Sequence, residues 1–412
     1  MENKKFGLIG KTLKHSYSKV IHEQFNRYDY DLYSLESDEL KSFLDSDIRG
    51  FNVTIPYKKQ IIEYLTDVQG VAKEIGAVNT VVKKGKDIIG YNTDFEGMKY
   101  MLSRAGITIT DKVVMVLGSG GTSNTAVALL KSLNAKKILI VSRTGEINYS
   151  NCYDNTGVQV IINTTPVGMY PNTNACPIDL DRFSNLEGVA DVIYNPSTTK
   201  LLFEAKRLGI KCTNGLPMLV AQAKFASDLF VEESMADGVI EKVLSNLEKG
   251  MKNILFIGMP GCGKSTIAKK VADLLGRELI DTDQEIVNRE GKDIPTIFAT
   301  SGEKYFRAKE SQVLNDVCSL SGKVIATGGG VVENAQNKFD IVKNSIVFYI
   351  KRDIKSLSTK GRPLSKDLDS VKELFKRRKP LYEQFCDIQI NNDSDIESAI
   401  NKVIKEYENF SN

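Results

Sequence analysis

Two short apolar runs, each followed at once by a glycine-rich loop and a helix-period stretch, most constrain the fold of this chain. Residues 113–117 precede the loop 118–121, and residues 253–257 precede the loop 258–263. A short apolar run of this kind is typical of a buried parallel strand. Two strand–loop–helix signals therefore predict an α/β chain with two separate nucleotide sites.

The chain divides into three expected α/β units, because 412 residues exceed one ordinary domain. An amphipathic segment ends near Gly250, which we interpret as its C-cap, so the last unit should begin at residue 249. The boundaries predicted from these signals are 1–98, 99–248 and 249–412. In the first unit we expect strands at 6–9, 48–53 and 77–82, and helices at 19–28 and 36–44.

Composition excludes several classes of protein. A net charge of +3 without a charged block gives no footprint for a nucleic-acid or membrane partner. No apolar run approaches the roughly 20 residues of a membrane span, and the basic N-terminus lacks a signal-peptide core. Two histidines and six scattered cysteines predict neither a zinc site nor a disulfide framework. We therefore expect a cytoplasmic protein with small-molecule partners, and its oligomeric state stays open.

The second glycine loop has the complete P-loop pattern. Gly258 and Gly263, with the four residues between them, would turn backbone N–H groups towards phosphates. Lys264 would supply a charge to the β- and γ-phosphates, and the Ser265 hydroxyl would bind Mg²⁺. A chance match is the alternative. The ATP-binding residues expected from this pattern are Gly261, Cys262, Gly263, Lys264, Ser265 and Thr266.

Two carboxylates follow the next strand-like run, residues 279–283. At the carboxyl edge of the sheet they would face the P-loop. Asp281 is placed to hold Mg²⁺ through water, and Asp283 to accept a proton from a hydroxyl group. A solvated turn is the alternative.

Residues 249–412 resemble shikimate kinase. The motifs that carry the resemblance, in family order, are Asp281-Thr282-Asp283, Gly302-Glu303-x-x-Phe306-Arg307-x-x-Glu310, Gly328-Gly329-Gly330, Arg362-Pro363-Leu364 and Arg378-x-Pro380-Leu381-Tyr382. The resemblance implies that Asp283, Arg307, Gly329, Gly330 and Arg378 bind shikimate. It also implies that Arg362 lies on a lid that closes over the phosphates. Two guanidiniums suit one carboxylate, and bare glycine backbone lets a polyol ring approach.

The first glycine loop is a partial dinucleotide fingerprint, and a tight turn is the alternative. The strand expected at 137–141 ends in Ser142, Arg143 and Thr144, without an acidic residue for ribose hydroxyls. Arg143 instead suits a 2′-phosphate, so the predicted cofactor is NADP(H). The residues expected to bind it are Gly118, Ser119, Gly120, Gly121, Thr122, Ser142, Arg143 and Thr144.

Lys58 and Asp94 are the candidate catalytic pair of the N-terminal half. Each follows a predicted strand, and we expect them at neighbouring strand ends. The carboxylate would orient the ammonium group, and Lys58 could then protonate an oxygen as hydride reaches a carbonyl. From these residues alone, a surface salt bridge is the better interpretation.

Residues 1–248 resemble shikimate dehydrogenase, which favours the catalytic interpretation. The motifs that carry the resemblance are Ser16-Tyr17-Ser18, Asn52-Val53-Thr54-x-Pro56-x-Lys58, Gly76-Ala77-Val78-Asn79-Thr80, Asn92-Thr93-Asp94, Gly118-Ser119-Gly120-Gly121, Ser142-Arg143-Thr144, Asn163-Thr164-Thr165-Pro166-x-Gly168-Met169, Tyr194-Asn195-Pro196 and Met218-Leu219-Val220-Ala221-Gln222-Ala223. The resemblance implies a substrate domain at 1–98 and 216–248, and a shortened Rossmann-like NADP domain at 99–215. The P-loop kinase domain at 249–412 would have a parallel sheet and a lid.

The resemblance also implies roles for single residues. Ser16 and Ser18 would hold a substrate carboxylate, and Lys58 with Asp94 would form the catalytic pair. Thr54, Asn79, Asp94 and Gln222 would bind ring hydroxyls. Tyr194, Thr164 and Met218 would line the nicotinamide side.

Together the two halves imply reduction of 3-dehydroshikimate with NADPH, then phosphorylation of shikimate by Mg-ATP. Two alternatives stay open at this point. One is a quinate/shikimate dehydrogenase fused to another small-molecule kinase. The other is a non-catalytic sensor that keeps both folds.

Overall fold

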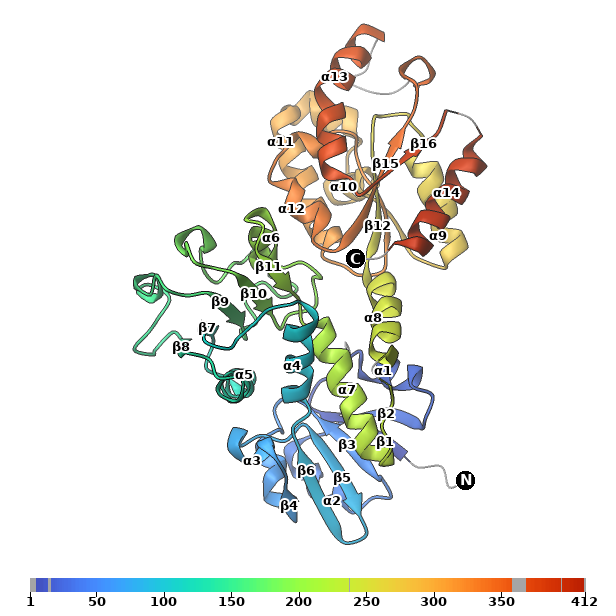
Figure 1. The fold of residues 1–412 in the computed structure, drawn as a ribbon. Coiled ribbons are helices and arrows are strands. Elements are labelled where there is room, and N and C mark those ends of the chain that lie inside the picture. The colour runs from blue at the N-terminus through green and yellow to red at the C-terminus, as the bar shows by residue number, and fades with distance from the viewer. Residues whose placement is uncertain (1–4, 14–15, 237, 358–367, 394, 411–412) are drawn as a thin grey trace. The chain divides into compact units, whose positions relative to one another are not determined.

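The chain folds into two compact units. The computed structural model describes residues 5–13, 16–236, 238–357, 368–393 and 395–410. The first unit comprises residues 1–168, 175–194 and 204–245, and the second comprises 169–174, 195–203 and 246–412. Both units combine parallel strands with covering helices, so the predicted α/β class is confirmed (Figure 1).

The first sheet of the first unit has six strands in the order β2-β1-β3-β5-β6-β4. Strand β5 runs antiparallel to both β3 and β6, and the other pairings are parallel. The strands are β1 (Lys5–Gly10), β2 (Asp29–Ser34), β3 (Gly50–Val53), β4 (Asp67–Val68), β5 (Thr80–Lys84) and β6 (Asp87–Tyr91). Since β5 is inserted between them, β3 and β6 point the same way and end at the same edge.

The second sheet of this unit is entirely parallel, with the order β11-β10-β9-β7-β8. Its strands are β7 (Val113–Leu117), β8 (Lys137–Val141), β9 (Val160–Asn163), β10 (Gly188–Asp191) and β11 (Lys211–Thr213). Between β8 and β9 the chain forms only the 3₁₀ turn η3 (Cys152–Asp154), with no α-helix or strand.

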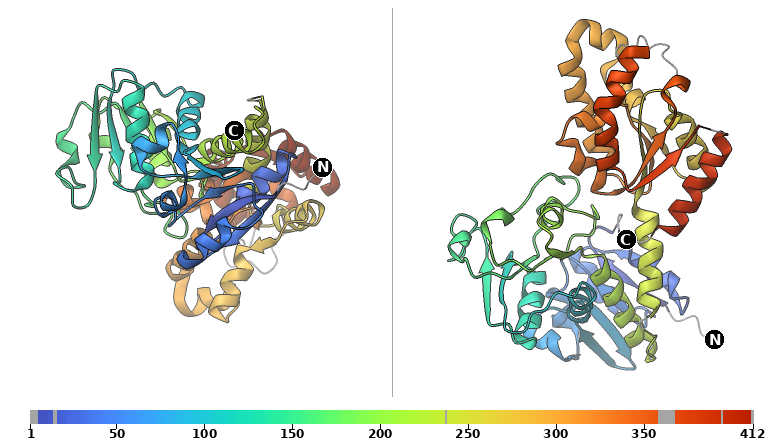
Figure 2. Two further views of the ribbon diagram at one scale, coloured as in Figure 1. Left: turned by 90° about the horizontal axis from the view of Figure 1, so that it is seen from below. Right: turned by 45° about the horizontal axis from the view of Figure 1, so that its top comes forward.

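Helices α4 (Asp94–Arg104) and α7 (Leu216–Val231) lie side by side in the first unit (Figures 1 and 2). Met98 and Met101 of α4 pack with Val114 and Val116 of β7. Phe230 of α7 packs against β1 in another cluster. The other elements of this unit are α1 (Ser18–Gln24), α2 (Leu40–Leu44), α3 (Val71–Ile75), α5 (Gly121–Ser132), η1 (Ser37–Glu39), η2 (Gln60–Tyr64) and η4 (Leu180–Arg182).

Two helix ends differ from the sequence prediction. Helix α1 stops at Gln24, before the expected residue 28, because Asn26 has the left-handed φ of 51°. Helix α8 (Gly238–Met251) continues through Gly250, which is not its C-cap. The Arg277 guanidinium satisfies the terminal carbonyls instead, by donating to Lys249 O at 3.0 Å and Lys252 O at 2.8 Å.

The second unit has a five-stranded parallel sheet in the order β13-β14-β12-β15-β16. Its strands are β12 (Asn253–Ile257), β13 (Leu279–Asp281), β14 (Val324–Ala326), β15 (Ser345–Lys351) and β16 (Ile388–Asn391). The helices are α9 (Lys264–Leu275), α10 (Thr282–Glu290), α11 (Ile294–Cys318), α12 (Asn337–Val342), α13 (Leu368–Phe385) and α14 (Ile396–Asn409), with the 3₁₀ turns η5 (Val331–Glu333) and η6 (Ile354–Ser356). Helix α6 (Lys200–Arg207), like α8, has residues in both units.

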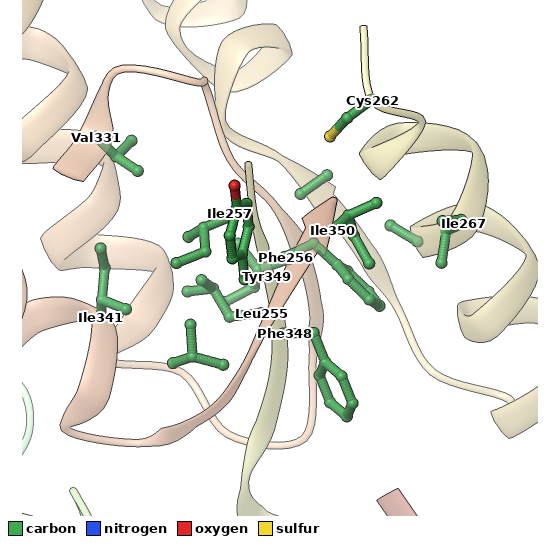
Figure 3. Packing of buried hydrophobic residues seen from close by; sticks show 14 of the residues in the cluster. Leu255, Phe256, Ile257, Cys262, Ile267, Val331, Ile341, Phe348, Tyr349 and Ile350 are labelled. Carbon is green, nitrogen blue, oxygen red and sulfur yellow. The ribbon is translucent and has the colours of Figure 1, made fainter. Parts of the chain in front are cut away.

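The two central strands of this sheet form the core of the second unit (Figure 3). Leu255, Phe256 and Ile257 of β12 lie beside residues of the neighbouring strand β15, with Phe256 opposite Phe348. All four side chains are fully buried. Helices α9 and α14 cover one face of the sheet, and α11, α12 and α13 cover the other (Figure 1). Strands buried on both faces explain the continuous apolar runs in the sequence.

A fully buried lysine ties together several segments of the second unit. Lys343 Nζ donates to Asp340 Oδ1 at 2.9 Å, to Asn315 Oδ1 at 2.9 Å and to Thr173 Oγ1 at 3.0 Å. Thr173 belongs to the segment Met169–Asn174, which lies about seventy residues of chain before the main part of this unit, residues 246–412. The ammonium group is therefore a buried cross-link between distant parts of the sequence.

Lys343→Met should destabilise the second unit by about 3–5 kcal/mol, because it leaves the buried Asp340 carboxyl without its cation. Circular dichroism during urea unfolding measures the loss. Lys402→Met, at an exposed position of α14, is the matched control and should change stability by less than about 0.5 kcal/mol. Equal effects of the two substitutions would contradict this prediction.

Candidate functional sites

The P-loop lies between β12 and α9 in the conformation that a phosphate cradle requires. Gly258, Gly261 and Gly263 have φ angles of 147°, 83° and 100°, in the region that favours glycine. Lys264, the first residue of α9, is 8% exposed and donates to Gly258 O at 2.9 Å. Its ammonium group thus lies inside the curl of the loop, where it can meet phosphate oxygens.

Ser265 and Asp281 meet beside this loop. The Ser265 hydroxyl donates to Asp281 Oδ2 at 2.9 Å, while Asp281 Oδ1 caps helix α10 by accepting from Asp283 N at 3.0 Å. One hydroxyl and one nearby carboxylate fit Mg²⁺, which keeps several waters and takes further ligands from phosphates. Thr266 is exposed next to Ser265, and Cys262 is buried under the loop.

Asp283 lies in the first turn of α10, not at the end of a strand. A Cβ atom at Gly328 would come within 2.7 Å of Asp283 Oδ1 and within 2.7 Å of Glu310 Oε1. Only glycine therefore leaves room for both carboxylates at this point. A cavity of about 450 Å³ is lined by Asp281, Asp283, Gln284, Val287 and Ile294.

Arg307 and Arg378 both lie near Gly328–Gly330, the glycines that follow strand β14. A Cβ at Gly330 would lie 2.0 Å from Arg307 Nη1, so the guanidinium packs directly on bare backbone. Gly329 packs against Pro260 of the P-loop, and its carbonyl accepts from the Tyr382 hydroxyl at 2.5 Å. Arg378 is 2% exposed. The structure thus brings both predicted arginines to the same wall of the candidate site, beside the P-loop.

Two carboxylates in this wall were not predicted as site residues. Glu310 accepts from Arg307 Nη1 at 2.7 Å, and Glu333 accepts from Arg378 Nη2 at 2.6 Å. Burial raises the pKa of Glu310, and the Arg307 charge opposes that shift. The i, i+3 spacing of Arg307 and Glu310 is a signal in the sequence. The sequence contains no such signal for Glu333, because its partner Arg378 is 45 residues away in the chain.

Arg362, the predicted lid residue, lies outside the described residues. Every other predicted residue of the second unit lies in the P-loop, beside it, or in the wall that contains Arg307 and Arg378.

Lys58 and Asp94 form an ion pair in the first unit, with Nζ 2.5 Å from Asp94 Oδ2. The two side chains are 28% and 16% exposed, so the pair is shielded but reachable. The expectation of neighbouring strand ends is wrong, because β5 separates β3 from β6. The pair still forms because β5 is antiparallel, which leaves the ends of β3 and β6 at one edge.

Asn79 directly precedes β5 at the same edge and is 3% exposed. Its Oδ1 accepts from Thr93 N at 2.7 Å, and its Nδ2 donates to Thr93 Oγ1 at 3.1 Å. These bonds hold Thr93, which precedes α4, and thereby fix the start of the helix that carries Asp94. Asn79 Nδ2 has a second N–H for a ligand.

Gln222 and Met218 of α7 approach α4 through Gly97. A Cβ there would lie 2.9 Å from Gln222 Cβ and 2.7 Å from Met218 O. Because Gly97 is three residues after Asp94, both lie on one face of α4. Gln222 therefore shares the Asp94 side of the helix.

The remaining predicted substrate residues lie in loops of the first unit. Ser16 Oγ accepts from Ser18 N at 3.2 Å, and Thr54 is half-buried directly after β3. Tyr194 meets Tyr17 edge to face, with ring centroids 6.0 Å apart. Tyr17 had no assigned role, although it lies between the two serines.

The first glycine loop presents bare backbone at the start of α5. Gly118 has φ of 109°, and a Cβ there would lie 2.8 Å from Thr164 Oγ1. A Cβ at Gly120 or Gly121 would meet no heavy atom within 4 Å, so the helix N-terminus faces open space. This geometry fits a pyrophosphate group. Ser119 is exposed, and Thr122 is half-buried.

Arg143 is exposed just beyond β8, with Thr144 also exposed and Ser142 half-buried. Burial raises the pKa of the nearby Tyr149, and the Arg143 charge opposes that shift. An exposed cation at the end of the second strand of a dinucleotide fold fits a 2′-phosphate.

Comparison with known proteins agrees with this geometry. The shikimate kinase family matches residues 260–408, and the shikimate dehydrogenase substrate binding domain family matches residues 8–81. A shikimate dehydrogenase (NADP(+)) of Caldicellulosiruptor bescii is 36% identical over 279 residues, covering 60% of this chain and 96% of that protein.

Two solved structures are similar to the same part of the chain. A chorismate mutase/shikimate 5-dehydrogenase fusion protein from Clostridium acetobutylicum has a TM-score of 0.59 and 34% identity, covering 60% of this chain and 98% of that one. A shikimate dehydrogenase in complex with NADP+ has a TM-score of 0.56 and 32% identity, covering 60% and 96%. The chain therefore belongs to the shikimate dehydrogenase family and carries a shikimate kinase domain at its C-terminus, which makes it a bifunctional enzyme of the shikimate pathway.

Proposed function

We propose that the chain reduces 3-dehydroshikimate to shikimate with NADPH and then transfers the γ-phosphate of ATP to the shikimate 3-hydroxyl. The observation that carries this proposal is that one chain holds both a shielded Lys58–Asp94 pair and a P-loop beside two converging arginines, Arg307 and Arg378. Both sites suit one small acidic polyol, since one offers proton transfer at a carbonyl and the other phosphoryl transfer to a hydroxyl.

In the reduction, the Lys58 ammonium donates a proton to the carbonyl oxygen of the substrate. Bound NADPH supplies the hydride. The Asp94 carboxylate, 2.5 Å from Lys58 Nζ, keeps the ammonium oriented and then accepts a hydrogen bond from the substrate. The Asn79–Thr93 bonds hold Asp94 in register with Lys58.

The other residues of this site position the substrate and cofactor. The Ser16 and Ser18 hydroxyls donate to the substrate carboxylate. Thr54, Asn79 and Gln222 bind ring hydroxyls, and Tyr194, Thr164 and Met218 line the nicotinamide side. The cofactor phosphates and ribose are bound by Gly118, Ser119, Gly120, Gly121, Thr122, Ser142, Arg143 and Thr144.

In the phosphorylation, Asp283 accepts the proton of the attacking hydroxyl group. Lys264 and the backbone of residues 261–266 hold the phosphates, while Ser265 and, through water, Asp281 hold Mg²⁺. Arg362 stabilises the charge on the transferring group. Arg307 and Arg378 bind the shikimate carboxylate, and the ring lies on Gly329 and Gly330.

The alternatives are less well supported by the sites. An enzyme that oxidises quinate with NAD would not need a cation such as Arg143 beside the ribose, because NAD has no 2′-phosphate. A ligand sensor would not need Lys58, Asp94, Lys264 and Asp283 together. We propose small-molecule partners and a cytoplasmic location, without nucleic-acid or membrane partners. No helix among the described residues is long and apolar enough to cross a membrane.

The proposal is tested by incubating the chain with 3-dehydroshikimate, NADPH and Mg-ATP, and identifying products by mass spectrometry. Shikimate 3-phosphate is the expected product. Formation of shikimate alone would refute the kinase assignment, and absence of turnover even with supplied shikimate would refute both assignments.

Lys58→Ala should lower kcat for reduction by about 10²–10⁴-fold, because no proton donor then faces the carbonyl oxygen. Phosphorylation of supplied shikimate should be unchanged. NADPH oxidation at 340 nm and ADP release measure the two activities. Lys59→Ala, at the exposed next position, is the control and should retain both. An active Lys58→Ala enzyme would exclude the proposed role.

Lys264→Ala should have the reverse effect. Loss of the charge inside the P-loop should lower kcat for phosphorylation by about 10²–10³-fold and leave reduction intact. Lys269→Ala, exposed on the same helix, should retain both activities. If Lys264→Ala stopped both reactions in a folded protein, two independent sites would be the wrong description.

Arg143→Ala should raise KM for NADPH about tenfold to a hundredfold, because a charge-assisted bond to the 2′-phosphate is lost. NADH lacks that phosphate, so its KM should not change. Steady-state kinetics with each cofactor measure the difference, and Lys136→Ala is the control for an exposed cation nearby. An equal rise in the KM for NADPH and the KM for NADH would show that Arg143 does not bind the 2′-phosphate.

A further inference from the structure

A carboxylate of the chain itself lies between the two guanidiniums to which we assign the shikimate carboxylate. Glu333 ends the turn η5, three residues after Gly330. Its Oε2 accepts from Arg378 Nη2 at 2.6 Å and from Arg307 Nη2 at 3.5 Å. One oxygen therefore contacts both arginines, as a bridging substrate carboxylate would.

The guanidiniums in this wall are already paired with carboxylates without a substrate. Glu333 Oε1 also pairs with Arg377, while Arg307 pairs with Glu310 at 2.7 Å and with Glu303 at 3.2 Å. Three guanidiniums thus face three carboxylates in this wall of the site, namely Arg307, Arg377 and Arg378 against Glu303, Glu310 and Glu333. A substrate carboxylate would bring a further negative charge, so it must compete with a carboxylate already present.

Water screens the charge of Arg378 and Glu333 only weakly, because both side chains are largely buried. The side chain of Arg378 is 2% exposed, and that of Glu333 is 18% exposed. Burial raises the pKa of Glu333, but the hydrogen bond and charge of Arg378, with the other two arginines, outweigh this and hold the pKa below its usual value. Glu333 is therefore fully ionised at neutral pH.

Arg378 retains an unused donor. Its Nε is buried and has no hydrogen-bond partner among the described residues, while its Nη2 is paired with Glu333. A carboxylate that replaced Glu333 could take both N–H groups of this edge in a bidentate pair, which is stronger than the single bond of Glu333. The unpaired Nε thus points to a second carboxylate ligand for this guanidinium.

We propose that Glu333 is an internal counter-ion of the shikimate-carboxylate site, which holds Arg307 and Arg378 in place and is displaced from them when the substrate carboxylate binds. This inference rests on the proposed kinase function. It makes Glu333 a residue that lowers the affinity for shikimate, because part of the binding free energy is used to exchange one carboxylate for another.

The test is Glu333→Gln in the full chain, assayed by ADP release with shikimate and Mg-ATP. No NADP(H) is added, so the dehydrogenase half does not turn over. The neutral amide keeps the size of the side chain but attracts the guanidiniums less. KM for shikimate should fall about threefold to tenfold, with kcat nearly unchanged.

A neutral ligand separates competition from a change in pocket shape. The carboxamide of shikimate carries no charge, so Glu333→Gln should not improve its KM. Glu303→Gln removes a carboxylate that pairs with Arg307 from a more exposed position, and it should lower the shikimate KM by less. A higher or unchanged KM for shikimate, or equal improvement for both ligands, would overturn the proposal.

A structure of the wild-type chain with shikimate and ADP tests the exchange without a variant. The expected result is a substrate carboxylate on Arg378 Nε and Nη2, with Glu333 Oε2 no longer within hydrogen-bond distance. Glu333 still bonded to Arg378, with the substrate carboxylate elsewhere, would overturn the proposal. A wild-type chain that releases no ADP with shikimate would refute the kinase function itself, whereas an active chain with an unmoved Glu333 would refute only this role.

Discussion

Both sites depend on one constraint, namely that strands running in the same direction end at the same edge of a sheet. The edge collects side chains from distant parts of the sequence, and glycine there exposes backbone N–H groups that a side chain would cover. In the second unit, Gly258, Gly328 and Gly330 all lie against groups that a Cβ would strike. In the first unit, the same edge brings Lys58 within 2.5 Å of Asp94, although 36 residues separate them. The candidate catalytic groups are thus positioned by the turns and helix starts that follow these strand ends.

The polar groups at these edges are held by one another rather than by solvent. Asn79 is bonded twice to Thr93, and Asp281 caps α10 while it accepts from Ser265. A buried polar group that lacks a partner is costly, so such networks leave few alternative arrangements. Pre-organisation of this kind lowers the reorganisation needed when charge develops during reaction. The same argument applies to Arg378, whose burial is tolerated because Glu333 pairs with it.

Local patterns in the sequence predicted the fold class and most of the candidate residues. The P-loop, the glycine loop before α5 and the run 281–283 are contiguous, and each signals its own geometry. Features that depend on partners far along the chain were missed. The insertion of β5 between β3 and β6, the capping of α8 by Arg277 and the pairing of Glu333 with Arg378 all join residues with no common motif. Their positions follow from packing and charge balance, which a single sequence does not display.

The two sites would hold the same acid by different means, and this difference has a consequence for release. In the proposed dehydrogenase site the carboxylate would meet neutral hydroxyl groups, which would bind an anion weakly enough for shikimate to leave. In the proposed kinase site it would meet guanidiniums, which would bind it much more strongly if they were unpaired. Shikimate 3-phosphate carries the same carboxylate as shikimate, so a site built for tight binding would also retain its product. An internal carboxylate that returns to Arg307 and Arg378 offsets this effect, because it replaces the departing anion and avoids leaving two buried cations without partners.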